Sequence, residues 1–377
     1  MMTAGRYPFA ESLARSASPI ILCGAIALIV ICTAVANSAA LDRTVTEALI
    51  RIVYVVGLYI FVGNSGVISF GHTAFMAVGA YATAWQDCCS TTKSLFMPAL
   101  PNFLLQVTVP PPIATIVSGV VASLFAAVVG VAIIRLSGIS ASIATFAVLA
   151  IINVTFSNWD SVTAGTTTLV GIPNYTDHWV GLLWAVIAIC AAHVYQTSRF
   201  GLSLRVSRED EIAAKASGVN IFNQRLIAFV ISAFFVGVSG ALYVHFLGTI
   251  SVEAFYIDIT LLTLAMLVVG GMNSLSGAVV GVGAISLLIE VLRQLEQGFV
   301  VGSLTVAAPG GTQEIGLGVA MLLVLIFRRG GITGNQEIGG QLSRSMQRAA
   351  MRYVVRTGNV EVSKHPSSVP GRPEKLT

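Results

Sequence analysis

The 377-residue sequence contains very little charge. Lysine and arginine number 21 and aspartate and glutamate 17, so charged residues make up 10% of the chain, against roughly 25% in a soluble globular domain. Hydrophobic residues make up 55%, and the mean hydropathy is +0.84. A soluble protein would need many more polar helix faces than this chain supplies. The net charge of +4 is small and lies mostly in loops and the tail, so no nucleic-acid partner is expected.

The usual motifs of catalysis and of nucleotide binding are missing as well. The sequence has no GxxxxGK[ST] phosphate-binding loop, no HExxH, no GxSxG and no constellation of paired carboxylates. The five cysteines show no metal-ligand spacing, and a disulfide between the adjacent Cys88 and Cys89 would be strained. We therefore expect a protein that is not an enzyme and that holds no metal and no cofactor.

What the sequence does have is a series of long apolar runs. Several reach the roughly 20 residues that cross a bilayer as a helix, which predicts an all-α, polytopic membrane protein with about ten transmembrane helices. The run at residues 20–36 is longer than the core of a typical signal peptide and is followed by further spans, so we expect a retained first helix. Arginine-rich connections place both termini and residues 198–225 in the cytoplasm.

Residues 198–225 form the longest strongly charged interval between two apolar runs. Ser207 is a favourable N-cap, the acidic residues after it suit a first helical turn, and Gly218 can end a helix in the left-handed conformation. These signals predict a short helix at 208–218. We interpret it as a docking element for a soluble partner, the alternative being a loop that only fixes topology. The residues expected to carry the docking are Arg208, Glu209, Asp210, Glu211, Ala213, Ala214 and Gly218.

Glycines and polar side chains interrupt two apolar stretches, at 55–85 and 257–281. Because an unsatisfied polar group is costly in hydrocarbon, such residues should face protein or a water-filled path. One interpretation is a translocation path. The other is a tight helix crossing in which the same side chains are satisfied. The candidate path residues are Asn64, Ser65, Ser69, His72, Gly271, Asn273 and Ser274.

Charged side chains near the apolar runs form two possible pairs. Glu47 and Arg51 are four residues apart and can meet on one helix face. Glu290 lies within an apolar run, and Arg293, one turn later, can pair with it. A relay of membrane carboxylates would favour a secondary transporter driven by an ion gradient. Glu290 is the single candidate for such a relay, so that alternative has little support.

Several of these stretches together resemble LivM-type permeases, the inner-membrane subunits of branched-chain amino acid ABC importers. The matching segments occur in the family's order and cover about residues 45–333. They read GVISFGHTAFMAVGAYATA, TLVGIP, SRFGLSLRVSREDEIAAKASGVN, RLIAFVISAFFVGVSGALY, LLTLAMLVVGGMNSLSGAVVG and FRRGGITG. Tyr59 and Asn64 differ from the family, which more often has asparagine at the first position and tyrosine at the second.

The resemblance implies a permease subunit in a bacterial inner membrane, with no ATP site of its own. Its implied partners are a second, LivH-like permease, two cytoplasmic ABC ATPases that bind the ATP, a periplasmic substrate-binding protein and the membrane lipid. The helix at 208–218 is then the coupling helix that sits in a cleft of the ATPase. The implied substrates are branched-chain or related small amino acids. Relatives that import urea, short amides or other small carboxylates remain an alternative.

The chain divides at about residue 333 into a transmembrane permease domain, 1–333, and a polar tail, 334–377. In the tail, arginines recur every four residues from Arg344 to Arg356 beside an apolar face, which predicts a basic amphipathic helix on the anionic inner leaflet. Residues 365–377 contain three prolines, and we expect this segment to be disordered.

Overall fold

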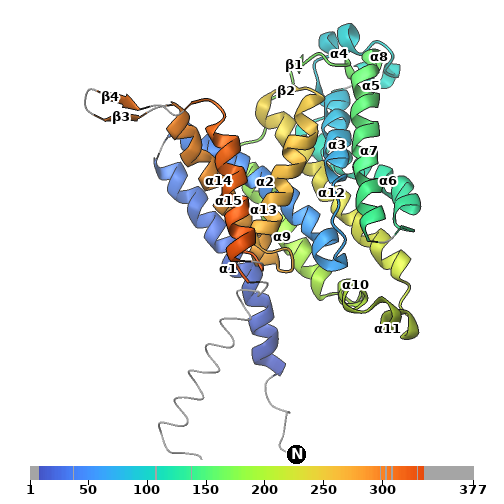
Figure 1. Cartoon of the computed structure of the whole chain (residues 1–377). Helices are drawn as coiled ribbons and strands as arrows, with labels where there is room; N and C mark the ends of the chain where they lie inside the picture. Colours follow the sequence, from blue (N-terminus) through green and yellow to red (C-terminus); the bar gives the residue numbers. More distant parts are fainter. Residues whose placement is uncertain are drawn as a thin grey trace, which may run out of the picture.

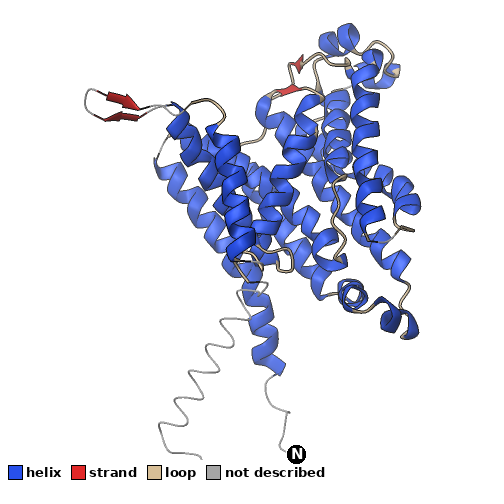
Figure 2. Cartoon of the chain, viewed as in Figure 1, coloured by secondary structure: helices blue, strands red, loops and turns tan. Residues whose placement is uncertain are grey.

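The computed structural model describes residues 8–36, 38–106, 108–136, 138–297, 299–301, 304–306, 309–328 and 330–334. Within these residues the chain is helical almost throughout (Figure 1). Figure 2 shows that its strands are short and lie outside the helix bundle. The predicted all-α, polytopic architecture is confirmed. The amphipathic helix and the disorder predicted for the tail concern residues that the structure does not describe.

Eight helices of the described chain are long and apolar enough to cross a membrane, the seventh of them together with the preceding η1. They are α1 (Pro8–Ala36), α2 (Ala39–Ser65), α6 (Pro111–Ile133), α7 (Ile139–Asn158), α9 (His178–Thr197), α12 (Ile221–Leu247), α13 (Ile257–Gly270) and α14 (Leu275–Gln297). Two further helices, α3 (His72–Asp87) and α15 (Thr312–Phe327), have 16 residues each. They fall short of a full span, which explains the difference from the about ten spans expected.

The core of the bundle lies where α2, α3, α6 and α12 pack together. Glycine makes the contact between α3 and α12 possible. A Cβ at Gly79 would overlap the backbone of Gly237, and one at Gly240 would overlap the backbone of Met76. Small residues that bring two backbones together are the usual means of helix association in membranes, where apolar burial gives little driving force.

The apolar stretch 55–85 is not one helix, because the chain breaks at residues 66–71. α2 ends at Ser65, and Gly66 follows with a φ of +73°, the left-handed conformation that commonly ends a helix. α3 then begins at His72. Gly71 lies against the backbone of Thr145 in α7, where a Cβ would not fit. The polar residues of this stretch therefore sit on a helix end and a loop.

The short elements gather at the two ends of the bundle (Figure 1). One end, called here the hairpin end, carries α10 (Arg199–Glu209) and α11 (Glu211–Ala216) between α9 and α12. The start of α1 also lies there. Residues 332 and 333 pack there, donating backbone hydrogen bonds to Val269 and Gly270 at the end of α13. The opposite end carries α4 (Ser90–Phe96), α5 (Asn102–Gln106), α8 (Asp160–Thr163) and the antiparallel pair β1 (Leu169–Val170) and β2 (Thr249–Ile250).

Two more elements complete the described chain. The 3₁₀ turn η1 (Glu253–Phe255) leads into α13. β3 (Phe299–Val301) and β4 (Leu304–Val306) form an antiparallel hairpin between α14 and α15. The outer helices expose large apolar side chains, with Val128 of α6 exposed by 76% and Ile139 of α7 by 80%. Exposing such large apolar faces to water is unfavourable, whereas contact with the lipid chains of a membrane is not.

Candidate functional site

The charged interval folds as a hairpin of two helices. Ser198 caps α10 by accepting a hydrogen bond from the Gly201 N–H. Asp210 has an extended backbone and caps α11, because its Oδ1 accepts hydrogen bonds from the N–H groups of Ile212 and Ala213 at 2.9 and 3.0 Å. Gly218 follows α11 with a φ of +82°. We call residues 198–218 the coupling hairpin, after the coupling role that the sequence resemblance predicts for them.

The single helix predicted at 208–218 is therefore wrong in its start. Ser207 is buried inside α10, and its hydroxyl donates to the carbonyl of Leu204, so it does not cap a following helix. Arg208 and Glu209 are the last residues of α10. Asp210 occupies the N-cap position instead, because its carboxylate accepts hydrogen bonds from two otherwise unpaired N–H groups of the next helix. The predicted end at Gly218 is confirmed.

One ion pair holds α11 to the start of α12, and a second lies within α11. Glu211 contacts Lys215 at 3.0 Å and Arg225 at 3.3 Å. The hydrogen bond from Lys215 and the nearby Arg225 charge hold the pKa of the Glu211 carboxyl below its ordinary value. Ala214 is fully buried against the chain, whereas Ile212 is 83% exposed and Ala213 is exposed. Ala214 thus packs inside, and the outward apolar residue is Ile212, which the sequence analysis missed.

Arg208 points into the protein rather than toward a partner. Its Nη1 donates to the carbonyl of Gly63 at 2.8 Å and to Oδ1 of Asn273 at 2.9 Å. Its Nη2 pairs with Glu209. One guanidinium therefore joins the end of α10 to the end of α2 and to the turn between α13 and α14.

Arg205 forms a second junction one turn earlier on α10. Its Nε donates to Oδ1 of Asn64 at 2.7 Å, and its Nη2 donates to Oε1 of Gln196 at 2.9 Å and to the Tyr59 hydroxyl. The Tyr59 hydroxyl also donates to Gln196 at 2.8 Å. Charge-assisted hydrogen bonds of this kind are stronger than neutral ones and fix geometry. Arg205 thus ties α10 to α2 and α9, and Tyr59 and Asn64 of α2 both accept hydrogen bonds from it.

The candidate path residues fall into two groups. Near the hairpin, Asn64 and Asn273 bind the two arginines, Gly271 forms the α13–α14 turn with a φ of +123°, and Ser274 caps α14 by accepting from the Gly277 N–H. The other group lies around the break between α2 and α3. It consists of Ser65, Ser69 and His72, all of them buried.

His72 occupies an aromatic pocket made by Phe61, Phe75 and Phe229, with ring centroids 5.3 to 5.6 Å away. Its Nδ1 lies 2.7 Å from the Ser69 hydroxyl. Ser65 accepts a hydrogen bond from the Val67 N–H. These contacts satisfy Ser65, Ser69 and Nδ1 of His72, whereas the buried Nε2 of His72 has no hydrogen-bond partner among the described residues. The role of these side chains in a translocation path stays a prediction.

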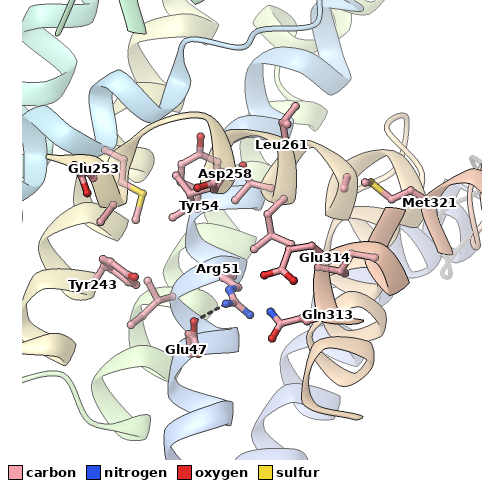
Figure 3. A pocket seen from close by; sticks show the side chains of 18 residues that line it. Glu47, Arg51, Tyr54, Tyr243, Glu253, Asp258, Leu261, Gln313, Glu314 and Met321 are labelled. Carbon is pink, nitrogen blue, oxygen red and sulfur yellow. Dashed lines mark hydrogen bonds and ion pairs between the residues drawn. The ribbon is translucent and has the colours of Figure 1, made fainter. Parts of the chain in front are cut away.

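A cleft of about 540 Å³, lined by charged and apolar side chains and called here the polar cleft for its charged residues, lies in the other half of the bundle (Figure 3). Its walls come from α2, α3, α12, η1, α13 and α15. Its wall on α2 carries the ion pair of Glu47 and Arg51, which confirms the pairing predicted from their spacing. Three more carboxylates line it, those of Glu253, Asp258 and Glu314. None of the candidate path residues lines this cleft. Sequence patterns do not reveal this cleft, because its charged residues come from four separate segments, α2, η1, α13 and α15.

Glu290 forms the ion pair that its spacing predicts. Its Oε2 accepts from Arg293 at 2.6 Å and from the Thr44 hydroxyl at 3.0 Å, and its Oε1 accepts from Gln294. Glu290 does not line the polar cleft. Among the described residues, no group of three or more metal-ligating side chains could hold a metal ion. The carboxylate is held in place by neighbours, and it has no chain of acids beside it.

Apolar outer faces and eight candidate spans among the described residues define a polytopic membrane protein. Residues 40–327 match the family described as the branched-chain amino acid transport system, permease component, and the chain belongs to this family. The LivM permease protein of the high-affinity branched-chain amino acid transport system of Escherichia coli is 26% identical over 326 residues, covering 77% of this chain and 69% of that protein.

The protein of the same description from Salmonella typhimurium is 25% identical over 321 residues, covering 76% of this chain and 68% of that protein. No solved structure matches the chain. The chain is therefore a LivM-type permease, a component of a transport system and a multi-pass protein of the inner membrane. The family resemblance seen in the sequence is confirmed.

Proposed function

We propose that the chain is the permease subunit of an ATP-driven importer that moves branched-chain or related small amino acids across the bacterial inner membrane. Its partners are a second, LivH-like permease, two cytoplasmic ATPases that bind and hydrolyse the ATP, and a periplasmic binding protein. The coupling hairpin and both termini face the cytoplasm. The family supports the transport role, and the arginine-rich hairpin end supports the orientation.

The observation that carries the proposal is the pair of arginines that bind the hairpin to the rest of the bundle. We call the hydrogen bonds of Arg205 and Arg208 to residues outside the hairpin the arginine latches. A loop that only fixes topology needs positive charge near the membrane, but it does not need specific partners. Arg205 and Arg208 instead bind Asn64, Gly63 and Asn273 on two other parts of the bundle. A partner that moves the hairpin therefore also moves the ends of α2 and α13.

The mechanism follows from these contacts. When the ATPases close on ATP, the hairpin moves with them as a lever, because α11 is clamped to α12 through Glu211 and Arg225. The latches transmit the displacement to α2 and to the α13–α14 turn, and the bundle switches from inward-open to outward-open. The binding protein then delivers its amino acid, and hydrolysis resets the importer.

Uptake into reconstituted vesicles tests this function. The tagged chain, purified with its subunits, should transport radiolabelled leucine only when ATP and the loaded binding protein are present on their proper sides. Uptake of urea or a short amide in place of leucine would assign the importer to the alternative substrate class. Leucine uptake without ATP, driven by an ion gradient, would contradict the proposal and indicate a secondary transporter.

A further inference from the structure

The polar cleft lies in the half of the bundle away from the coupling hairpin. On α2, Glu47 and Arg51 come several turns before Ser65, where the helix reaches α10. Asp258 and Glu314 stand in the first turns of α13 and α15, which both run toward the hairpin end. Under the proposed topology, this half of the bundle faces the periplasm, from which a substrate arrives.

The charged part of the cleft presents both positive and negative side chains to a ligand. Arg51 is 17% exposed, and Glu47 is its partner among the described residues. Figure 3 shows its guanidinium turned away from α2 toward Gln313 and Glu314 of α15. The other nitrogens of Arg51 can therefore donate to an anionic group in the cleft, in the bidentate manner that arginine offers to carboxylates.

Three carboxylates besides that of Glu47 line the charged part of the cleft. Glu253, Asp258 and Glu314 are exposed, and their side chains form no hydrogen bond or ion pair with another described residue. Together they give the cleft an excess of negative charge beyond the Glu47–Arg51 pair. An ammonium group is the ligand that such unpaired carboxylates favour.

The part of the cleft nearer the hairpin end is lined by apolar side chains. Leu261 and Leu262 follow Asp258 by about one turn of α13, and Leu317 and Met321 follow Glu314 by about one and two turns of α15. Since both helices descend toward the hairpin end, these side chains lie beyond the charges. A volume of about 540 Å³ is within the roughly 300–1,000 Å³ of small-molecule sites.

We propose that this cleft is a substrate-binding site for a zwitterionic aliphatic α-amino acid. Arg51 binds the carboxylate of the ligand, the unpaired carboxylates attract its ammonium group, and the apolar wall receives the aliphatic side chain. The juxtaposition of a guanidinium, free carboxylates and leucine side chains in one cleft carries the assignment. It rests on the proposed function, and it adds the location of the amino acid within the membrane subunit.

Photo-crosslinking tests the site directly. The probe is photo-leucine, which keeps both charged groups of leucine and carries a diazirine in its side chain. The purified complex in lipid nanodiscs is illuminated with the probe, and the labelled peptides are located by mass spectrometry. Labelling should fall on α13 and α15 around Leu261, Leu317 and Met321, and excess leucine should suppress it.

Matched variants separate binding from folding. The double variant Glu47→Gln with Arg51→Gln removes the cleft's ion pair without leaving one charge alone, and labelling should drop by about tenfold or more. Glu290→Gln with Arg293→Gln removes an equivalent pair outside the cleft, and labelling should persist. Co-purification of the other subunits shows that each variant is assembled.

Three outcomes overturn the site. The first is labelling confined to other segments, and the second is labelling that the cleft variant leaves unchanged. The third is that isoamylamine, which lacks the carboxylate, suppresses labelling as effectively as leucine does. The last outcome would show a cation site. Failure of the site leaves ATP-dependent leucine uptake by the unmodified complex intact, whereas failure of the proposed function removes that uptake, so the two failures are distinguishable.

Discussion

At the scale of residues, two arginines define the hairpin end. The sequence predicts a docking role for Arg208, which stays a prediction, and the structure shows its guanidinium bound to Gly63 and Asn273. Arg205 received no role from the sequence, because its acceptor Asn64 lies 141 residues away. Spacing rules reach three or four residues along a helix, so such long-range pairs are invisible to them.

Replacing Arg208 with alanine should uncouple hydrolysis from transport. Hydrogen bonds to a charged group contribute about 1.5–3 kcal/mol, so removing the latch should lower the leucine transported per ATP hydrolysed by about tenfold or more. The ratio of uptake to phosphate release in vesicles measures this. Arg199→Ala is the matched control on the same helix, because the Arg199 guanidinium stacks on its own neighbour Phe200. An unchanged ratio in Arg208→Ala would contradict the latch.

At the scale of elements, the long apolar helices are predictable and the breaks between them less so. Apolar runs identify the spans, since only a helix satisfies its backbone in lipid. The break at 66–71 depends on Gly66 at the helix end and on Gly71. Both glycines lie against distant parts of the chain, Gly66 against the Arg208 side chain and Gly71 against the backbone of Thr145. The hairpin divides at Asp210 rather than Ser207 because α10 buries Ser207, which a local capping rule does not see.

The N-cap of α11 gives a prediction for this element. Asp210→Ala removes both cap hydrogen bonds, which typically costs about 0.5–2 kcal/mol, and the affinity of the complex for its ATPase should fall by about two- to thirtyfold. Asp210→Asn keeps a cap oxygen and should bind nearly as the parent does. Titration of nanodisc-embedded permease with the purified ATPase measures both. Equal loss in the two variants would show that the Asp210 charge contacts the partner, rather than capping α11.

At the scale of the whole molecule, the two sites lie in opposite halves of one bundle. α2 links them. It carries Glu47 and Arg51 in the cleft, and near its end at Ser65 it carries Gly63 and Asn64, which bind Arg208 and Arg205. α13 also links the two sites. It begins near Asp258 in the cleft and ends at Gly270, next to the turn in which Asn273 binds Arg208. A movement of the coupling hairpin therefore reaches the cleft through two continuous helices. The sequence predicted the family and a short helix ending at Gly218. It did not predict the division of the hairpin at Asp210, or the cleft, whose residues come together only in the folded chain.

The most direct test of this account is a mild-detergent purification of the tagged chain from its native host. An ATPase and a second permease should co-purify, with ATP hydrolysis in the eluate. The double variant Ile212→Glu with Ala213→Trp alters the exposed face of α11 and should lose the ATPase but keep the second permease. Val170→Glu, at the opposite end, should keep both. Recovery of the ATPase with the α11 variant would contradict docking at the coupling hairpin, and recovery of the chain alone, still transporting without ATP, would contradict the importer.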